Sequence, residues 1–193
     1  MVSSKRSNGF TLIELLVTIA VLAILVTLAG PAFNQAEQRR VIGAAESALS
    51  ELQMARTEAI KQGREIHFVT DEKNDGDWCH GISEQSGCDC FVTDATAADA
   101  CLIKIAESGG DTGDDDGRVL RATQSDEFRG IDLVGPGGRQ EIHFEPVRGT
   151  AVGGSALILE FSDNNFRMQV EVNAIGRPSA CGPDRAMGAY NQC

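Results

Sequence analysis

The sequence predicts an α+β protein in which one long amino-terminal helix packs on an antiparallel β-sheet. Three observations support this class. A continuous apolar run covers residues 10–30, a helical stripe of small residues covers residues 31–62, and polar and apolar residues alternate in segments after Gly63. At 193 residues the chain suits one globular domain with an appendage and can bury an adequate core.

Residues 10–30 are long and apolar enough to cross a bilayer as a helix. The run has 21 residues, and about 20 span a hydrocarbon core of roughly 30 Å. Lys5 and Arg6 precede it, which fits a cytoplasmic amino terminus. A cleaved secretory signal fits less well, because its apolar run is only roughly 7 to 15 residues long and closes with a small-residue cleavage site. We expect a single-pass anchor.

Glu14 is the one carboxylate in this apolar run. An acidic side chain inside a membrane is costly and needs a partner. If the chain is cut after Gly9, Phe10 becomes a free amino terminus four residues from Glu14. The carboxylate can then neutralise the amino terminus of a neighbouring copy, so Glu14 would set the register between packed helices.

The segment at residues 31–62 is predicted to continue the helix as its amphipathic half. Small and apolar residues recur there at three- and four-residue steps, namely Ala45, Ala48, Leu49, Leu52, Ala55 and Ala59. We expect this stripe to pack on the sheet. Lys61 and Gly63 mark the end of the helix, which is about 80 Å long. Pro31 and Gly43 are the expected sites of bending or melting.

Alternation with a period of two predicts strands in the remainder, residues 63–193. The stretches "REIHFVT" and "RQEIHFEP" place isoleucine and phenylalanine on one face and polar residues on the other. The stretches "ALILEFS" and "FRMQVEV" are predicted to pair through a turn at residues 163–165. We expect one antiparallel sheet with one face on the helix. Residues 71–138 are expected to be mostly loops, with short strands near 101–106 and 118–122.

All six cysteines follow residue 78, which favours disulfides in an oxidising compartment. Four of them lie in a cysteine-rich insertion at residues 71–117, namely Cys79, Cys88, Cys90 and Cys101. Zinc binding is the alternative, with His80 adjacent, but the C-x8-C-x-C-x10-C spacing lacks the paired C-x2-C knuckles of structural zinc sites. We expect two disulfides within this group. Four cysteines can pair in three ways, which the sequence does not rank. We do not expect a Cys88–Cys90 bond, because so short a loop would be strained.

Two oxygen-rich loops, at residues 71–77 and 108–118, invite comparison with calcium sites. Neither fits the twelve-residue loop, because the second lacks a closing glutamate and the first has Lys73 where a ligand belongs. We interpret both as solvated acidic loops. The sequence contains no nucleophile motif, phosphate-binding loop or paired carboxylates, so we expect no catalytic residue, no metal and no cofactor.

The remaining aromatic and imidazole side chains are interpreted as structural. His67, His80 and His143 do not cluster in the sequence, and the first and third fall on polar faces of predicted strands. We expect those two to face solvent. Trp78 is expected to pack within the domain, since a single aromatic residue without basic neighbours makes a poor nucleic-acid site.

The stretch "GFTLIELL" resembles the processing site of type IV pilins and type II secretion pseudopilins. In that family a membrane peptidase cuts between the glycine and the phenylalanine and methylates the new amino terminus. The resemblance implies that residues 1–9 are a leader, that cleavage falls between Gly9 and Phe10, and that Phe10 is N-methylated. Glu14 is then the fifth residue of the mature chain. It also implies a pilin-like roll and a helix kink at Pro31.

Three further stretches, "ARTEAIKQGREIHFV", "GDWCHGI" and "RMQVEVNAIGRPSAC", resemble the branch with the FimT and FimU minor pilins and the H-type (GspH) pseudopilins. The terminal pair Cys181 and Cys193 resembles the disulfide-closed carboxyl loop of pilins. This favours a minor pilin, a structural or assembly-priming subunit of a type IV pilus. The alternative is an H-type minor pseudopilin of a type II secretion system.

The same resemblance implies partners and a location. The partners are other pilin or minor pilin subunits, the prepilin peptidase and the inner membrane platform. The chain would be a single-pass inner-membrane protein with its carboxyl-terminal domain in the periplasm, and later a subunit of an assembled pilus or pseudopilus.

A FimT-like DNA receptor is the third alternative. That role is associated with a Gly-Arg-x-Arg motif near the carboxyl end, but the matching run, Gly176 to Ser179, lacks the second arginine. The formal charge of −11 becomes −13 when Lys5 and Arg6 are removed with the leader. An acidic protein repels nucleic acid at long range. DNA binding is therefore disfavoured, and Arg177 is its candidate contact.

Overall fold

The computed structural model describes residues 10–73, 75–104, 117–135, 137–153, 157–163 and 165–193, without the side chains of residues 28–33 and 157. Contacts divide the chain into two units, residues 1–37 and 38–193. Some predicted features lie outside the described residues. These are the leader with Gly9, the oxygen-rich loop at 108–118 except its last two residues, and the centre of the turn at 163–165.

Helix α1 (Leu12–Gln62) supplies most of the first unit. Large apolar side chains from Leu12 to Val26 are exposed on every side of it, at 49–80% of their area. Within the described residues, no helix meets the length and hydropathy required of a membrane span. The span predicted at residues 10–30 stays a prediction.

Helix α1 runs without interruption through Pro31 and Gly43. The helix therefore does not melt at either residue, and bending at Pro31 or Gly43, including the kink at Pro31, stays a prediction. The carboxyl end of the helix is confirmed. Gln62 is its last residue, the N–H of Gly63 donates to the carbonyl of Ala59 at 3.0 Å, and Gly63 has the left-handed φ of 65° that commonly terminates helices.

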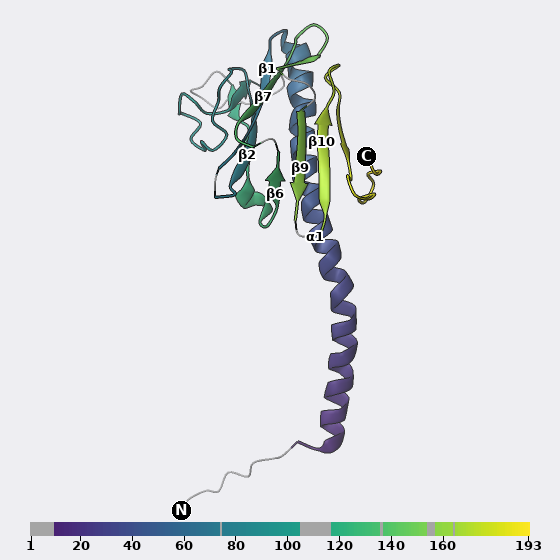
Figure 1. Ribbon diagram of the computed structural model, residues 1–193. Coiled ribbons are helices and arrows are strands. Elements are labelled where there is room, and N and C mark those ends of the chain that lie inside the picture. Colours follow the sequence, from purple (N-terminus) through teal and green to yellow (C-terminus); the bar gives the residue numbers. More distant parts are fainter. Residues whose placement is uncertain (1–9, 74, 105–116, 136, 154–156, 164) are drawn as a thin grey trace, which may run out of the picture. The chain divides into compact units, whose positions relative to one another are not determined.

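In the second unit, the small-residue stripe of α1 is buried against strands (Figure 1). Leu49 is only half-buried, but the other five predicted positions are fully buried. Val41 and Ala44 extend the stripe toward the amino terminus and are also fully buried. Because alanine leaves space beside the helix backbone, large strand side chains such as Phe68 and Phe161 can fill it.

Among the described residues, the strands form a five-stranded sheet, a four-stranded sheet and a separate pair, and all their pairings are antiparallel. The five-stranded order is β5-β2-β1-β7-β8, the four-stranded order is β11-β10-β9-β6, and β3 pairs with β4. The bounds are β1 Ile66–Glu72, β2 Trp78–Ser83, β3 Leu102–Lys104, β4 Arg118–Leu120, β5 Ala122–Gln124, β6 Asp132–Val134, β7 Gln140–Phe144, β8 Ala151–Val152, β9 Leu157–Ser162, β10 Arg167–Val172 and β11 Pro178–Cys181, with a short 3-10 helix η1 at Ser125–Phe128.

The α+β class, the long helix and the alternating strands are confirmed. Strands β1 and β7 pair with Phe68 opposite Ile142, and β9 and β10 form the predicted hairpin with Leu159 opposite Val170. The expectation of a single sheet is wrong. No strand of the five-stranded sheet pairs with a strand of the four-stranded sheet, so two separate sheets share the helix and the core.

Strand β2 is the main element that the sequence did not predict, because residues 71–138 were expected to be mostly loops. All six of its residues are buried, so its sequence has no polar face to alternate with an apolar one. A Cβ at Gly81 would lie 2.7 Å from the carbonyl oxygen of Arg121 and 3.2 Å from Cβ of Cys101. Neighbouring residues therefore pack closely on the face of β2 that is turned away from the core. This explains why β2 lacks a polar face.

Enlarging the alanine face should destabilise the second unit. We expect Ala48→Leu to lower the free energy of unfolding by about 1–3 kcal/mol, because Ala48 is fully buried and the extra carbons must displace packed neighbours. The matched control is Ser50→Leu, at an exposed position of the same helix, which should change stability by no more than about 0.5 kcal/mol. Urea unfolding of the full chain in detergent measures both, and equal effects would contradict the buried face.

Candidate sites for processing and assembly

Phe10 and Glu14, two of the residues predicted for processing and assembly, lie at the start of α1. Phe10 is 80% exposed, and Glu14 lies in the first turn of the helix. The N–H of Glu14 donates to Oγ1 of Thr11 at 3.3 Å, so Thr11 caps the helix. A carboxylate in this turn is also favoured by the helix dipole. Sequence analysis missed this capping role, although the Thr-x-x-Glu spacing is a recognised signal for it.

The four cysteines of the insertion are joined as Cys79–Cys90 and Cys88–Cys101. The prediction of two disulfides without a Cys88–Cys90 bond is confirmed, and the structure selects one of the three connectivities. All four side chains are at least 97% buried and form a small cluster with Val69. No free cysteine occurs in the described part of the chain, so zinc binding by these sulfurs has no support here.

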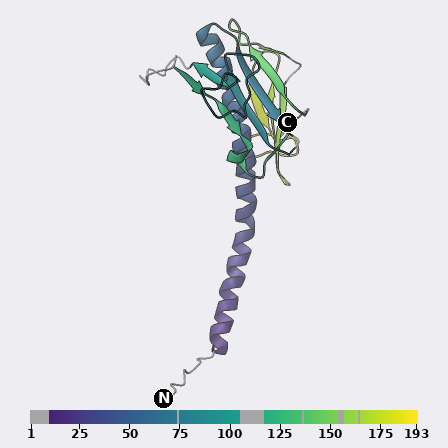
Figure 2. The ribbon, with the colours of Figure 1, turned by 90° about the vertical axis from the view of Figure 1, so that its left-hand side faces the viewer.

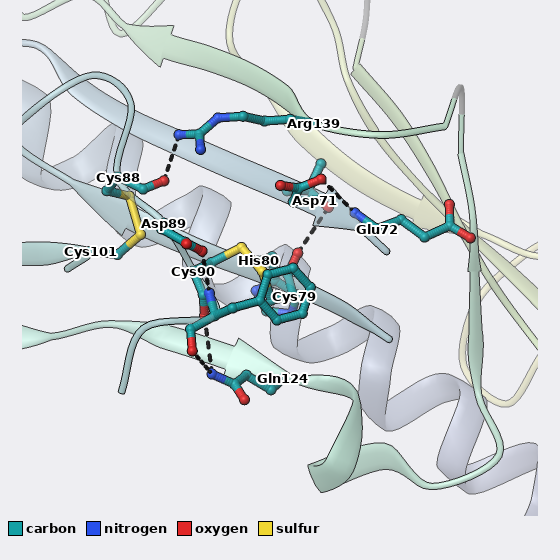
Figure 3. The surroundings of a disulfide bond; sticks show 12 residues. Asp71, Glu72, Cys79, His80, Cys88, Asp89, Cys90, Cys101, Gln124 and Arg139 are labelled. Atoms are coloured by element: carbon teal, nitrogen blue, oxygen red, sulfur yellow. Dashed lines mark hydrogen bonds between the residues drawn. A yellow bond between two sulfur atoms is a disulfide. The ribbon is translucent and has the colours of Figure 1, made fainter. Parts of the chain in front are cut away.

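Hydrogen bonds hold the disulfide loop on the outer face of the five-stranded sheet (Figure 3). Arg139 Nη2 donates to the carbonyl of Cys88 at 2.5 Å. Gln124 Nε2 donates to the carbonyls of Cys90 and Phe91 at 3.2 and 3.0 Å. Lys73 lies 3.6 Å from the centre of the Phe91 ring, which adds a cation–π contact. The loop is therefore a fixed part of the domain surface.

A third disulfide, Cys181–Cys193, closes the carboxyl-terminal loop that the pilin resemblance implied. Nε and Nη2 of Arg167 on β10 each donate to the carboxylate of Asp184 at 2.8 Å. The hydroxyl of Tyr190 donates to Glu46 of α1 at 2.9 Å, and Met187 is buried in the core. The loop is thus attached both to the four-stranded sheet and to the helix.

These contacts change the pKa values of two loop residues. The hydrogen bonds from Arg167 lower the pKa of the Asp184 carboxyl below its usual value. Partial burial, and then the hydrogen bond to Glu46, raise the pKa of Tyr190. The Asp184 contact therefore stabilises the loop above the usual carboxyl pKa, and the Tyr190 contact stabilises it below the usual phenol pKa.

Two of the histidines lie beside one another on neighbouring strands. His67 on β1 is directly opposite His143 on β7, with ring centres 5.4 Å apart, and Nδ1 of His67 is 2.9 Å from a carboxylate oxygen of Glu141. The His67 side chain is only 12% exposed, so its predicted solvent-facing position is wrong. The disulfide loop reaches this face, since the N–H of Gly87 donates to Glu141 at 3.2 Å.

His80 forms a buried polar link between the helix and the sheet. Its Nδ1 lies 2.7 Å from Glu51 of α1, and Thr123 of β5 donates to the same carboxylate at 3.2 Å. Trp78 packs as predicted, fully buried, and its Nε1–H donates to the carbonyl of Ile131 at 2.7 Å. Among the described residues no group of three or more potential ligands is arranged to hold a metal ion.

Arg177, the candidate DNA contact, lies in the turn between β10 and β11. Its N–H donates to Oδ1 of Asn173 at 2.9 Å, while its side chain is exposed. The adjacent Gly176 contacts a second turn, which carries Arg148. The structure thus brings a second exposed arginine to the neighbouring turn, which the sequence could not indicate.

Comparison with known proteins identifies the family. Residues 44–176 match the family described as type II transport protein GspH, and residues 4–30 match the prokaryotic N-terminal methylation motif. The first match covers more than half of the chain, so the chain belongs to the GspH family. The predicted branch is confirmed.

Two curated relatives are fimbrial proteins of Pseudomonas aeruginosa. Each is 39% identical over 62 residues, which cover 32% of this chain and 40% of the relative. The match therefore spans less than half the length of those relatives. Two crystal structures of the type IV minor pilin FimU of Pseudomonas aeruginosa are also similar, each with a TM-score of 0.46. They are 19% and 18% identical to this chain, cover 75% and 78% of it, and are themselves covered to 94%.

Peptide mapping without reduction should recover the three pairs Cys79–Cys90, Cys88–Cys101 and Cys181–Cys193. Cleavage between Cys88 and Cys90 is needed to separate the first two pairs, and Asp89 supplies a site for an Asp-specific protease. The matched control is the same digest after reduction, in which the linked masses should disappear. Recovery of Cys79 joined to Cys88 or Cys101 would contradict the structure.

The carboxyl-terminal loop should loosen at acidic pH. Because the folded-state pKa of Asp184 is lowered, its contribution is present above the unfolded carboxyl pKa and is lost as the pH falls through the folded value. We expect the protection factors of the amides of residues 182–192, which compare the observed exchange rate with the intrinsic rate at each pH, to fall below about pH 4. In Asp184→Asn this exchange should be faster at neutral pH and should lose that acid step. An unchanged acid step in the variant would assign it to another group.

Proposed function

We propose that this protein is a minor pilin, a non-enzymatic structural or assembly-priming subunit of a type IV pilus. One observation carries the proposal. The methylation-motif match at residues 4–30 includes the first part of a helix whose apolar side chains, from Leu12 to Val26, are exposed on all sides and whose first turn carries Glu14. A helix that is apolar all round requires a lipid or protein environment.

The mechanism follows from moving this helix between two apolar environments. We propose that residues 10–30 anchor the subunit in the inner membrane after the peptidase cuts between Gly9 and Phe10. During assembly the helix leaves the lipid and packs among the helices of other subunits. Glu14 then meets the methylated amino terminus of a neighbour, and the ion pair selects one register because a mismatched register would bury an uncompensated charge.

The carboxyl-terminal domain is proposed to face the periplasm and then the outside of the filament. Its three disulfides support this location, because disulfides persist in oxidising compartments. The partners are proposed to be other pilin or minor pilin subunits, the prepilin peptidase and the inner membrane platform. An H-type minor pseudopilin of a type II secretion system remains the alternative, and the GspH family match is compatible with it. The disulfide-closed carboxyl loop favours the pilus.

Removing the charge of Glu14 should impair assembly without impairing membrane insertion. We expect Glu14→Gln to reduce the amount of this subunit in sheared filaments about ten-fold or more, which corresponds to a loss of about 1.4 kcal/mol. Its amount in the membrane fraction should not change. Quantitative mass spectrometry measures both fractions and also reports whether the mature chain begins at N-methylated Phe10.

Thr11→Ala is the matched control, because it removes the helix cap but keeps the charge. If Glu14 acts mainly through capping, the two variants should assemble equally poorly, and the register role would be wrong. A normal amount of the Glu14→Gln chain in filaments would have the same consequence. Loss of secreted substrates rather than of surface pili, in cells that lack this protein, would favour the pseudopilin.

A further inference from the structure

Three segments of the second unit meet at Gly149. These are the last turns of α1, the turn between β7 and β8, and the turn between β10 and β11. The carbonyl of Gly149 accepts a hydrogen bond from Arg56 Nε at 3.0 Å. A Cβ placed on Gly149 would lie 2.9 Å from Ile60 Cδ1, and one placed on Gly176 would lie 1.8 Å from the Gly149 carbonyl oxygen. Only glycine allows such close contact between the two turns.

This junction presents an exposed surface that is both apolar and basic. We call it the apex surface and define it by Ile60, Val147, Arg148, Ile175 and Arg177. The three aliphatic side chains are 49%, 85% and 64% exposed in that order, and both arginines are exposed. Single exposed aliphatic residues are common on soluble domains. Here three exposed aliphatic side chains from three separate elements form one patch. Such a patch is typical of an interaction surface.

The apex surface is held in shape by backbone hydrogen bonds. In the first turn, the N–H of Gly149 donates to the carbonyl of Glu145 at 2.9 Å, and the N–H of Glu145 donates to the carbonyl of Thr150 at 3.0 Å. In the second turn, the N–H of Gly176 donates to the carbonyl of Asn173 at 2.8 Å. Val147 and Ile175 are therefore presented on ordered turns, which lowers the entropy cost of binding.

The two arginines of the apex surface have no ionic partner in the described part of the chain. Neither guanidinium hydrogen-bonds or pairs with a carboxylate there. Glu145, the acid of the same turn, is half-buried and accepts a hydrogen bond from Thr150 at 2.7 Å. In a chain with a formal charge of −11, two free arginines on one patch are a local exception.

An acidic surface lies near the opposite end of the same unit. We call it the acidic rim and define it by Asp75, Asp77, Asp126 and Asp132. All four are exposed, and they line one shallow hollow together with Arg129. Val134, 51% exposed, lies on the same strand as Asp132. The rim thus combines negative charge with a nearby apolar side chain, which complements the apex surface.

The position of each surface along α1 can be read from its contacts. Phe128, beside the acidic rim, lies 3.6 Å from the Cβ position of Gly43, whereas the apex surface contains Ile60. Seventeen residues of helix separate those two positions, which is about 25 Å. Figures 1 and 2 agree, since η1 and β6 lie beside the earlier turns of this part of α1 and the β10–β11 turn lies at its carboxyl end.

We propose that the apex surface of one copy docks on the acidic rim of a second copy. Arg148 and Arg177 would form ion pairs with the aspartates of the rim. The three aliphatic side chains of the apex surface would pack together and against Val134 of the second copy. The two surfaces are different and lie at opposite ends of the unit, so the contact is head-to-tail and can repeat along a filament. This inference deepens the proposed assembly role and rests on it.

A nucleic-acid role for the same surface is less well supported. Affinity for DNA grows with the number of phosphates neutralised, and the apex surface offers two free arginines. Its centre is aliphatic, without an aromatic ring for base stacking. Glu65 adds an exposed negative charge beside Ile66, which pairs with Phe144 at the start of the first turn. Charge and composition therefore favour a protein partner.

The test places a photo-crosslinking amino acid at Val147 in the full chain, purified in detergent micelles. Irradiation should give a dimer in which position 147 is joined to a peptide from residues 75–77 or 125–134 of the other copy. The double variant Arg148→Glu/Arg177→Glu should lower the dimer yield about ten-fold, and so should Asp126→Arg/Asp132→Arg. A mixture of the two double variants should restore the dimer, because Arg148 and Arg177 of the second variant then meet the unchanged rim aspartates of the first.

Restoration is expected when all four substitutions are combined in one chain, because the charges at both surfaces are then exchanged. Arg39→Glu/Arg40→Glu is the matched control; it changes the charge equally at exposed helix positions outside both surfaces and should leave the dimer yield unchanged. Raising the salt concentration to about 0.5 M should lower the yield, since screening weakens exposed ion pairs.

Crosslinks to any other face, or a yield insensitive to the charge exchange, would overturn the proposal. Salt-sensitive binding of duplex DNA that is lost in Arg148→Glu/Arg177→Glu would also overturn it, by assigning the apex surface to nucleic acid. The crosslinking experiment uses purified chain, so its result does not depend on whether the subunit enters filaments in cells. Failure of the unaltered subunit to enter filaments in cells would contradict the proposed function instead.

Discussion

The contact between the alanine face of α1 and the two sheets is the constraint on which the second unit depends. Alanine at positions 44, 45, 48, 55 and 59 leaves room for aromatic side chains from both sheets, including Phe68 and Phe161. Close packing makes any change of side-chain volume costly at such a face. Because the core lies on one side of a single helix, the loops around it are positioned relative to that helix.

Polar residues at the borders of this face attach two of those loops and two strands of the five-stranded sheet to the helix. Glu46 accepts from Tyr190 of the carboxyl loop, Glu51 links His80 and Thr123 across the five-stranded sheet, and Arg56 donates to Gly149 at the apex surface. Each contact is a side chain of α1 reaching a distant part of the chain. The helix that is proposed to carry assembly through its apolar half therefore also determines where the domain presents its binding surfaces.

Sequence periodicity predicted strands where one face is buried and the other is exposed. In β7 and β10, buried residues such as Ile142 and Val170 alternate with less buried ones, and both strands were predicted. In β2 the core covers one face and the disulfide cluster covers the other, so the alternation disappears. The division into two sheets was also not predictable, because strand pairing between distant segments leaves no periodic signal in either strand.

The sequence by itself determined the family, the length and end of the helix, its buried stripe and the number of disulfides, because each depends on a local motif, a period or a count. The tertiary structure decided which cysteines pair, that His67 faces His143, and that Arg148 lies on a turn next to that of Arg177. These arrangements join residues that are 11 positions apart, as in Cys79–Cys90, to 76 positions apart, as for His67 and His143, and they depend on how the sheets fold onto the helix. No local pattern of residue types encodes that geometry.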